Sequence, residues 1–255
     1  DDGAFRGGAF AELAELEERH WWFRARTELI GWALRTYFPA ARSFFDAGCG
    51  TGSVLDALGR AAPALRRSGG ELLAAGLESA ARRLGSVPLC QVDATRLPFA
   101  EEFDVVGAFD VIEHIEDDEA ALRSFRRALR PRGGLLLTVP QHAWLWTDAD
   151  EFGGHRRRYA RADLAAKLGR TGFEVVRMTS FVTLLLPLMV ASRALARAPR
   201  SASEALGELR RAGRLGPLPG AAMRVERRLI RAGLDLPWGG SLLVVARRPD
   251  GSVQP

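Results

Sequence analysis

Short apolar runs alternate with longer stretches of helical periodicity along most of this chain. The predicted strands are a first one that begins at Phe44 and six others at Leu72–Leu77, Val87–Val92, Phe103–Phe109, Leu135–Val139, Phe173–Met178 and Ser241–Ala246. Apolar runs of this kind, separated by helical stretches, are typical of parallel strands that helices cover on both faces. The pattern therefore predicts an α/β fold.

Helical periodicity occurs on both sides of the first strand. The predicted helices are Ala9–Arg19 and Arg24–Phe38 before it, and Ser53–Arg67, Asp117–Arg130, Arg161–Thr171 and Ala221–Ala232 after it. These elements predict a single domain over 1–255. It would consist of a helical leader (1–40), a core (41–180), a helical insertion (181–240), and a last strand with a tail (241–255).

The composition narrows the class of protein. The 255 residues are 47% hydrophobic, enough for one large core, and the net charge of +5 comes almost wholly from arginine, since Lys167 is the single lysine. The arginines lie among acidic neighbours, so we interpret them as solvated helix faces and expect no nucleic-acid partner. The two cysteines predict neither disulfides nor zinc, and no signal-peptide pattern is visible. We expect a cytoplasmic protein of a GC-rich bacterium.

The first strand runs into a glycine-rich turn, Asp46-Ala47-Gly48-Cys49-Gly50-Thr51-Gly52, and a helical stretch follows. Glycine lets the backbone approach a ligand closely and adopt positive φ, while a helix N-terminus offers unpaired N–H groups. This arrangement predicts a bed for a nucleotide-like cofactor, with a merely Gly-rich tight turn as the alternative. The dinucleotide fingerprint G-x-G-x-x-G does not fit, because Ser53 stands in place of its third glycine.

Acidic residues end two of the following predicted strands. Ligands of parallel sheets bind outside the carboxyl ends of the strands, so these residues are candidates for cofactor contacts. Glu78 ends the second predicted strand, where its carboxylate could accept both ribose hydroxyls, and Asp93 ends the third. Glu71 has a spacing closer to that of Rossmann folds, but it would begin the second strand at the wrong edge of the sheet. We therefore predict Glu78.

The order of motifs resembles that of class I S-adenosylmethionine (SAM)-dependent methyltransferases. The acidic-x-G-x-G-x-G loop is similar to their first motif, and Phe109-Asp110-Val111-Ile112-Glu113-His114 is similar to the hDxxEH segment of UbiE- and UbiG-like members. The turn Pro131-Arg132-Gly133-Gly134 is similar to their LxPGG turn, with Arg132 where a small residue is usual. The His-Trp-Trp-Phe leader and the His155 to Tyr159 segment are similar to those of an uncharacterised bacterial branch.

The resemblance implies a Rossmann-like sheet of order 3-2-1-4-5-7-6, with strand 7 antiparallel, helices on both faces and the leader as a lid over the cofactor. It implies SAM as cofactor and S-adenosylhomocysteine as product, with the Asp93 carboxylate accepting from the adenine amino group. The cofactor-binding residues expected on these grounds are Arg26, Asp46, Gly48, Cys49, Gly50, Gly52, Glu78, Asp93, Ala94, Phe109 and Asp110.

Methyl transfer from SAM needs proximity, alignment and, for a hydroxyl or ammonium acceptor, removal of a proton. The candidates for a base or an orienting group are His114, His155 and Tyr159. The candidates for acceptor contacts are Trp22 in the leader and, just past the fifth predicted strand, Trp144, Trp146, Asp150 and Arg158. Loops at the carboxyl edge of the sheet usually carry substrate contacts, and tryptophans can wall an apolar or planar acceptor. The alternatives are a capping or packing role for His114, packing for Trp22, and a solvated turn for the arginines that include Arg158.

A metal site is the less favoured alternative at the fourth strand. UbiG-like enzymes carry an ExxEH set that can hold a divalent cation, and Asp110, Glu113 and His114 resemble it with Asp in place of the first Glu. Three neighbouring ligands are too few for a hard cation, and the shorter Asp retracts one of them. We expect no metal.

The insertion between the last two strands leaves two interpretations open. Its apolar part would form a lid or a dimer face, or else, with nearby arginines, a peripheral membrane contact through 181–200. We expect a methyltransferase, monomeric or homodimeric, that acts on a small-molecule acceptor of lipid-like or natural-product type. The alternative is a non-catalytic SAM-binding or membrane-associated protein.

Overall fold

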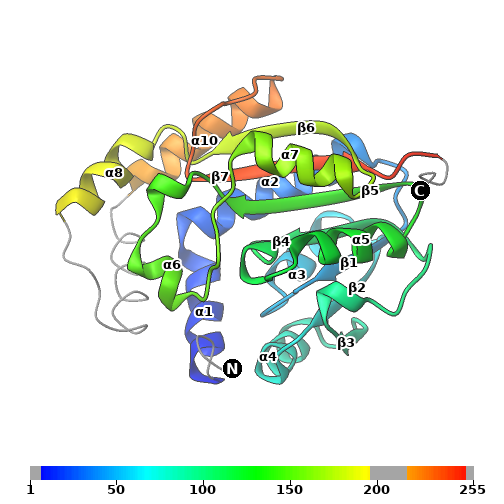
Figure 1. Cartoon of the computed structure of the whole chain (residues 1–255). Helices are drawn as coiled ribbons and strands as arrows, with labels where there is room; N and C mark the ends of the chain where they lie inside the picture. The colour runs from blue at the N-terminus through cyan, green and yellow to red at the C-terminus, as the bar shows by residue number, and fades with distance from the viewer. Residues whose placement is uncertain (1–6, 196–216, 251–255) are drawn as a thin grey trace.

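Seven strands form one sheet in the order β3-β2-β1-β4-β5-β7-β6 (Figure 1). The computed structural model describes residues 7–195 and 217–250. The strands are β1 (Ser43–Ala47), β2 (Arg66–Glu71), β3 (Leu89–Gln91), β4 (Phe103–Phe109), β5 (Leu129–Pro140), β6 (Glu174–Phe181) and β7 (Ser241–Arg247). Pairing is parallel from β3 to β5, whereas β7 is antiparallel to both β5 and β6. The predicted fold class, strand order and antiparallel last strand are confirmed.

The sheet separates two hydrophobic cores, and both of its faces are covered by helices. They are α1 (Gly7–Arg19), α2 (Trp21–Tyr37), α3 (Ser53–Ala61), α4 (Ala74–Leu84), α5 (Asp118–Ala128), α6 (Asp148–Phe152), α7 (Arg161–Arg170), α8 (Leu186–Leu195) and α10 (Pro217–Arg231). On one face, α5 and α7 bury Phe125 and Leu164 against the sheet. On the other, α2, α3 and α10 bury side chains such as Leu29, Leu55 and Met223.

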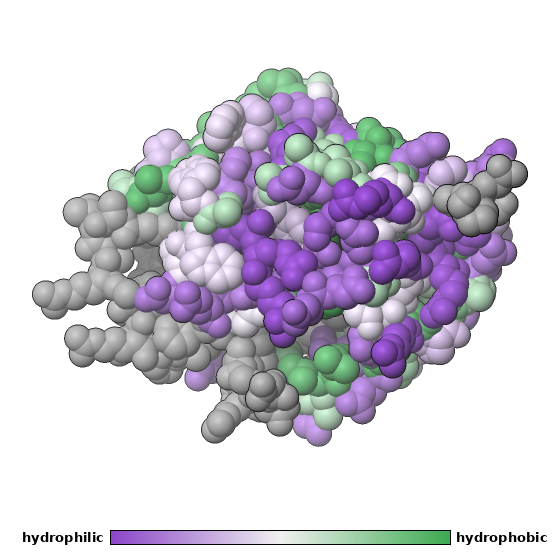
Figure 2. Space-filling view, viewed as in Figure 1, coloured by the Kyte–Doolittle hydropathy of each residue, from purple (hydrophilic) through white to green (hydrophobic). Residues whose placement is uncertain are grey.

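The outer side of α5 is a solvated, charged surface. Figure 2 shows mostly hydrophilic residues over this helix. Glu119 pairs with Arg170 at 2.6 Å and with Arg123 at 3.6 Å, and Arg130 just beyond the helix pairs with Asp104 at 2.8 Å. These arginines therefore have acidic partners, in line with the interpretation of scattered arginines as solvated helix faces.

The second strand lies earlier in the chain than the sequence pattern predicts. The predicted strand Leu72–Leu77 is wrong: Leu72 is exposed, and α4 begins at Ala74. The strand is Arg66–Glu71, which holds no apolar run because Gly69 and Gly70 occupy its middle. A Cβ at Gly70 would lie 2.5 Å from Cγ1 of Val92, so side chains of neighbouring elements fill the space that this strand's own side chains would occupy.

The part of the insertion that follows β6 is fixed to α10 by one buried carboxylate. Glu226 accepts hydrogen bonds from the main-chain N–H groups of Val182 (2.6 Å), Thr183 (2.7 Å) and Leu184 (2.9 Å). Val182 adopts a φ of 63°, which is costly for a β-branched residue. Burial raises the pKa of Glu226, although the three N–H groups favour its charged form. In the described parts of the chain, no helix combines the length and apolar character needed to cross a bilayer.

Replacing Glu226 with alanine should lower the free energy of unfolding by about 2–4 kcal/mol, because three N–H groups lose a charged acceptor. Urea unfolding followed by circular dichroism measures the change. Arg224→Ala, an exposed substitution on the same helix, should stay within about 0.5 kcal/mol of the parent. Equal effects of the two variants would show that the carboxylate does not hold the β6 exit.

Candidate functional site

The glycine-rich loop leaves β1 with three successive alternate glycines in left-handed backbone. The φ angles of Gly48, Gly50 and Gly52 are 80°, 52° and 76°. A Cβ at Gly48 would meet Val111 at 2.6 Å and one at Gly52 would meet Leu84 at 2.7 Å, whereas one at Gly50 would meet no heavy atom of the described residues within 4 Å. The backbone at Gly50 therefore borders open space, as a bed for a ligand requires.

The acid at the carboxyl end of β2 is Glu71. Its carboxylate accepts from the main-chain N–H groups of Gly50 and Leu73, each at 3.0 Å, and so joins the strand end to the loop. Glu78, the residue predicted for the ribose, lies on α4 with an exposed side chain, so its predicted position is wrong. The misplaced strand caused this error, although the spacing of 21 positions from Gly50 to Glu71 was a usable signal in the sequence.

Asp46 sits beneath the loop as a buried acid. It is 2% exposed, and its Oδ1 has no hydrogen-bond partner in the described structure. Burial raises its pKa to about 7, with the nearby carboxylates of Glu71 and Glu17 adding to the shift and Arg26 opposing it. Burial also raises the pKa of the Cys49 thiol, which is therefore a packed, unreactive side chain.

The third strand end places its acid at the surface. Asp93 is exposed two residues beyond β3, where its Oδ1 accepts from the N–H and hydroxyl of Thr95. Ala94 begins a short 3-10 helix and packs against the core. Asp93 thus has a carboxylate oxygen left for another donor.

The N-terminal helices reach the same edge of the sheet. Arg26 of α2 pairs with Asp110 at 2.5 Å, its guanidinium lies over the ring of Trp22 at 4.9 Å, and Asp110 also accepts from Thr138 Oγ1 at 3.0 Å. In addition, Glu17 of α1 accepts from the Ser53 hydroxyl at 2.9 Å. No pattern in the sequence indicated this contact, which docks α1 against the start of α3.

Phe109, expected beside the cofactor, packs in the core. Its ring stacks on Phe44 with centroids 6.4 Å apart, and it is buried. Trp22 in turn stacks on Phe181 at 6.4 Å.

A second cluster lies in the segment between β5 and α7. Asp150 is 2% exposed and takes a hydrogen bond from His155 Nδ1 at 2.8 Å and an ion pair from Arg158 at 2.7 Å. Burial alone would raise the pKa of Asp150, but the bonds from His155 and Arg158 outweigh it and hold that pKa far below its usual range. Asp150 and Arg158 therefore brace this segment from within, which corrects their prediction as acceptor contacts.

His155 packs against the end of the hDxxEH segment. The rings of His114 and His155 meet edge to face at 4.7 Å, and His114 Nδ1 donates to the Gly154 carbonyl at 3.3 Å. Burial, with the neighbouring His155, lowers the pKa of His114 to about 4, so its imidazole is neutral at neutral pH. Glu113 is fully buried, and neither of its carboxylate oxygens has a hydrogen-bond partner among the residues that the structure describes. Burial, with the charge of Asp110, raises its pKa well above the usual range.

Ligand atoms of Glu113, His114 and His155 all lie within 4.8 Å of one another. This trio, and not Asp110, is the group near this strand end that could approach a cation, because the Asp110 carboxylate is taken by Arg26. Three protein ligands would leave much of the coordination of a hard cation to other donors.

Tyr159, a predicted base, is a core residue. It is 2% exposed, and its hydroxyl lies 2.7 Å from Asp118 Oδ2 and 3.1 Å from the Ile112 carbonyl. Burial and the bond to Asp118 raise its pKa beyond any physiological range. No substrate can reach this hydroxyl, so the predicted role is wrong. The partner Asp118, which also binds Lys167 at 2.6 Å, comes from a distant helix that sequence spacing does not point to.

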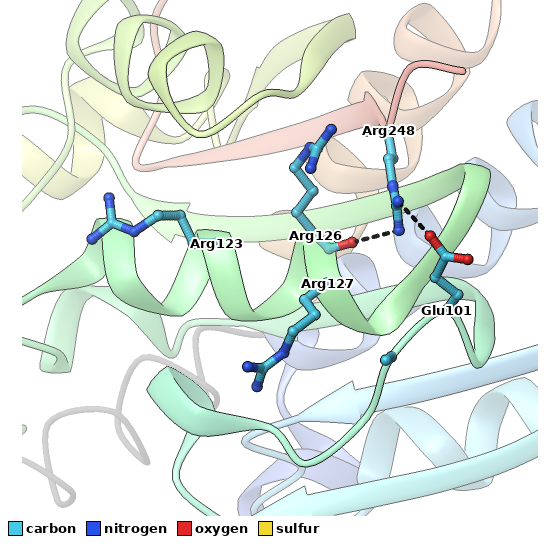
Figure 3. A pocket seen from close by; sticks show the side chains of 6 residues that line it. Glu101, Arg123, Arg126, Arg127 and Arg248 are labelled. Atoms are coloured by element: carbon cyan, nitrogen blue, oxygen red, sulfur yellow. Dashed lines mark hydrogen bonds and ion pairs between the residues drawn. The ribbon is translucent and has the colours of Figure 1, made fainter. Parts of the chain in front are cut away.

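An arginine-lined hollow of about 370 Å³ lies at the opposite edge of the sheet. Figure 3 shows that the guanidinium groups of Arg123, Arg126 and Arg127 point in different directions. Arg126 donates to the Gly172 carbonyl at 3.1 Å, and Arg248 donates to the Leu129 carbonyl at 2.5 Å and to Glu101 at 2.6 Å. This hollow is held by structural hydrogen bonds and is distant from the glycine loop.

A family model described as a methyltransferase domain matches residues 17–178, well over half of the chain. The chain belongs to the methyltransferase-domain family. The predicted membership among class I SAM-dependent methyltransferases is thereby confirmed.

Two curated relatives and one solved structure show how far the similarity extends. A probable S-adenosylmethionine-dependent methyltransferase of Mycolicibacterium smegmatis is 32% identical over 165 residues, 63% of this chain and 62% of that protein. An uncharacterized 37.1 kDa protein in transposon TN4556 of Streptomyces fradiae is 30% identical over 190 residues, 71% of this chain and 55% of that protein. The chain therefore spans less than two thirds of the length of either relative.

The solved structure is the partner of the Haloferax volcanii Trm112 methyltransferase activator in their complex. It aligns with a TM-score of 0.67 over 97% of both chains, at 18% identity. At that identity the likeness concerns the fold alone.

The loop of this methyltransferase domain fits an adenosyl cofactor. Gly50 borders open space, Glu71 ends β2 beside it, and Asp46 keeps an unpartnered buried oxygen. A carboxylate next to the loop suits the positive charge of a sulfonium, and a carboxylate at a strand end suits ribose hydroxyls.

Gly50→Val should lower the affinity for SAM at least 100-fold in titration calorimetry, because the new side chain would fill the open space beside the loop. Gly85→Val is the matched control, since Gly85 also has positive φ (62°) with no heavy atom within 4 Å of a built Cβ. Both variants should lose similar stability through left-handed strain, while only the Gly50 variant loses the cofactor. Normal affinity in a folded Gly50→Val protein would contradict the assignment.

Glu71→Gln should weaken SAM affinity by about 10- to 100-fold, the loss expected for charge-assisted hydrogen bonds, whereas Glu78→Gln should leave it unchanged. The two variants remove one charge each and lie seven positions apart, so net charge cancels in the comparison. A larger effect at Glu78 would restore the original prediction.

Proposed function

We propose that this protein transfers a methyl group from SAM to a hydroxyl or amino group of a small-molecule acceptor, with His155 as the base. The observation that carries the proposal is the Asp150–His155 pair, which lies beside the hDxxEH segment at the sheet edge that holds the glycine loop. Family membership supports the reaction class, and the half-buried histidine, held by a buried carboxylate, supports proton removal.

SAM, when bound, supplies a methyl carbon already activated by its sulfonium. The chain's own contribution is to hold the acceptor in line with that carbon and to accept the proton that the acceptor loses. With SAM bound, the acceptor's lone pair would take the methyl group, the electrons of the carbon–sulfur bond would stay on sulfur, and His155 Nε2 would accept the acceptor's proton. S-Adenosylhomocysteine and the methylated acceptor are the products.

The geometry prepares His155 for this role. Asp150 accepts a hydrogen bond from the Nδ1–H group of His155. This bond fixes the tautomer and leaves Nε2 free to accept a proton. The buried carboxylate of Asp150 also stabilises the imidazolium that would form. Arg158 and the N–H of Thr147 (2.8 Å) hold that carboxylate in place.

His114 is better suited to support than to proton transfer. Its low pKa makes it a weak base at neutral pH, and its Nδ1 is bound to the Gly154 carbonyl. Its ring packs against His155 and restricts that ring's orientation. We therefore assign the base to His155 and ring positioning to His114.

Incubating the protein with methyl-labelled SAM and fractions of a bacterial extract should label a compound in the small-molecule fraction. His155→Gln should reduce that labelling about 10²- to 10⁴-fold, as expected for loss of a general base, with SAM affinity kept within twofold. Asp150→Asn should also lower the rate, because the Nδ1–H of His155 then loses its charged acceptor. Glu151→Gln, an exposed neighbour, is the control. Label found only in RNA, DNA or protein would refute a small-molecule acceptor.

A further inference from the structure

Three aromatic rings form a stack where β5 ends and β7 begins. The imidazole of His142 lies between the indoles of Trp144 and Trp238, with ring centroids 5.4 and 5.3 Å apart and interplanar angles of 30° and 23°. We call this set the aromatic stack. Trp144 and Trp238 are 56% and 58% exposed. Both indoles are thus stacked on His142 and still more than half exposed.

Main-chain contacts hold the two halves of the aromatic stack together although they are far apart in sequence. The Gln141 N–H donates to the Gly240 carbonyl at 3.0 Å, and its side-chain amide donates to the Pro237 carbonyl at 3.3 Å. His142 adopts a φ of 62°, and its N–H donates to the Tyr159 carbonyl at 3.1 Å. Left-handed backbone in a non-glycine residue costs energy and concentrates at functional sites.

The aromatic stack shares its support with the proposed base. Arg158 donates to the Gln141 carbonyl at 3.3 Å and, through the same guanidinium, holds Asp150. Asp150 in turn orients His155. Arg158 thus helps to fix both the aromatic stack and the proposed base within the segment from Gln141 to Tyr159.

The chemistry of the aromatic stack favours a flat, conjugated ligand. Burial and the nearby Arg158 lower the pKa of His142, so the middle ring is neutral at neutral pH. Indole faces attract planar rings through offset stacking, an attraction that a saturated ring of the same size lacks. Neutral rings at this spacing give no particular attraction to an anion.

We propose that the methyl acceptor carries a planar conjugated ring, which extends the aromatic stack at an exposed indole face and presents its hydroxyl or amino group to His155. The proposal rests on the proposed function, and it names the acceptor class that the function leaves open.

The test compares 1-naphthol with decahydro-1-naphthol, a saturated ring system with the same carbon skeleton, as ligands of the SAM-saturated protein. Saturation-transfer NMR titrations give the affinity of each for the parent, Trp144→Ala, Trp238→Ala, the two Trp→Phe variants and Leu188→Ala. We expect saturable binding of 1-naphthol that at least one Trp→Ala variant weakens about tenfold. The matching Trp→Phe variant should restore it to within about threefold.

Leu188→Ala is the control for general apolar adhesion, because Leu188 is 54% exposed on α8 and carries no ring. Equal binding of the two alcohols, or binding of 1-naphthol that no variant changes, would overturn the proposal. So would tryptophan-dependent binding to phosphatidylglycerol vesicles without binding of 1-naphthol, since the two indoles would then serve a membrane surface.

Turnover separates this inference from the function on which it rests. Ring-selective binding without S-adenosylhomocysteine formation from any extract fraction would count against methyl transfer and leave the stacking site standing. Labelling of a small molecule that Trp144→Ala and Trp238→Ala leave unchanged would do the reverse.

Discussion

Left-handed backbone at the carboxyl ends of four strands is the constraint around which this site is built. Glycines accept it after β1, whereas Asp110, His142 and Val182 adopt it after β4, β5 and β6, with φ angles of 57°, 62° and 63°. Each of these non-glycine residues costs energy, so contacts from other elements must offset it. Arg26 binds Asp110, Tyr159 accepts from the His142 N–H, and Glu226 holds the N–H of Val182.

In the function proposed above, the sheet edge has two halves, one for the cofactor and one for the acceptor. The cofactor half would comprise the ends of β1, β2 and β3, where the backbone and acidic side chains would bind SAM. The acceptor half is built after β5, where the buried ion pair of Asp150 and Arg158 fixes a histidine. Buried charges of this kind persist only where partners satisfy them, so this ion pair also makes the conformation of the segment well defined.

Much of the fold followed from the sequence because its strands end in motifs with a physical meaning. The glycine loop, β4 and the antiparallel last strand were predicted near their observed positions. The second strand was missed because Gly69 and Gly70 carry no apolar pattern: the side chains that bury this strand, such as Val92, belong to its neighbours. A pattern along one segment cannot report packing that other segments supply.

The same reason explains which site residues were misjudged. Tyr159 and Asp150 have residue types suited to catalysis. Only the tertiary contacts show that Asp118 binds the Tyr159 hydroxyl and that Arg158 binds the Asp150 carboxylate. Glu71 could be recognised in the sequence as an acid at a suitable spacing, but its position beside the glycine loop depends on where the strand ends. Residue type and order thus identified the family, while solvent access decided the roles.

The reversed direction of β7 has a consequence for how this fold can diversify. Because that strand runs against its neighbours, its first residue, Ser241, pairs with Pro140, the last residue of β5. The loop containing Trp238 therefore lies beside His142, at the sheet edge where β5 ends. Insertions before this loop could therefore reshape the surface proposed for the acceptor without disturbing the glycine-rich loop. The same fold could in this way come to accept a different methyl acceptor while keeping its methyl donor.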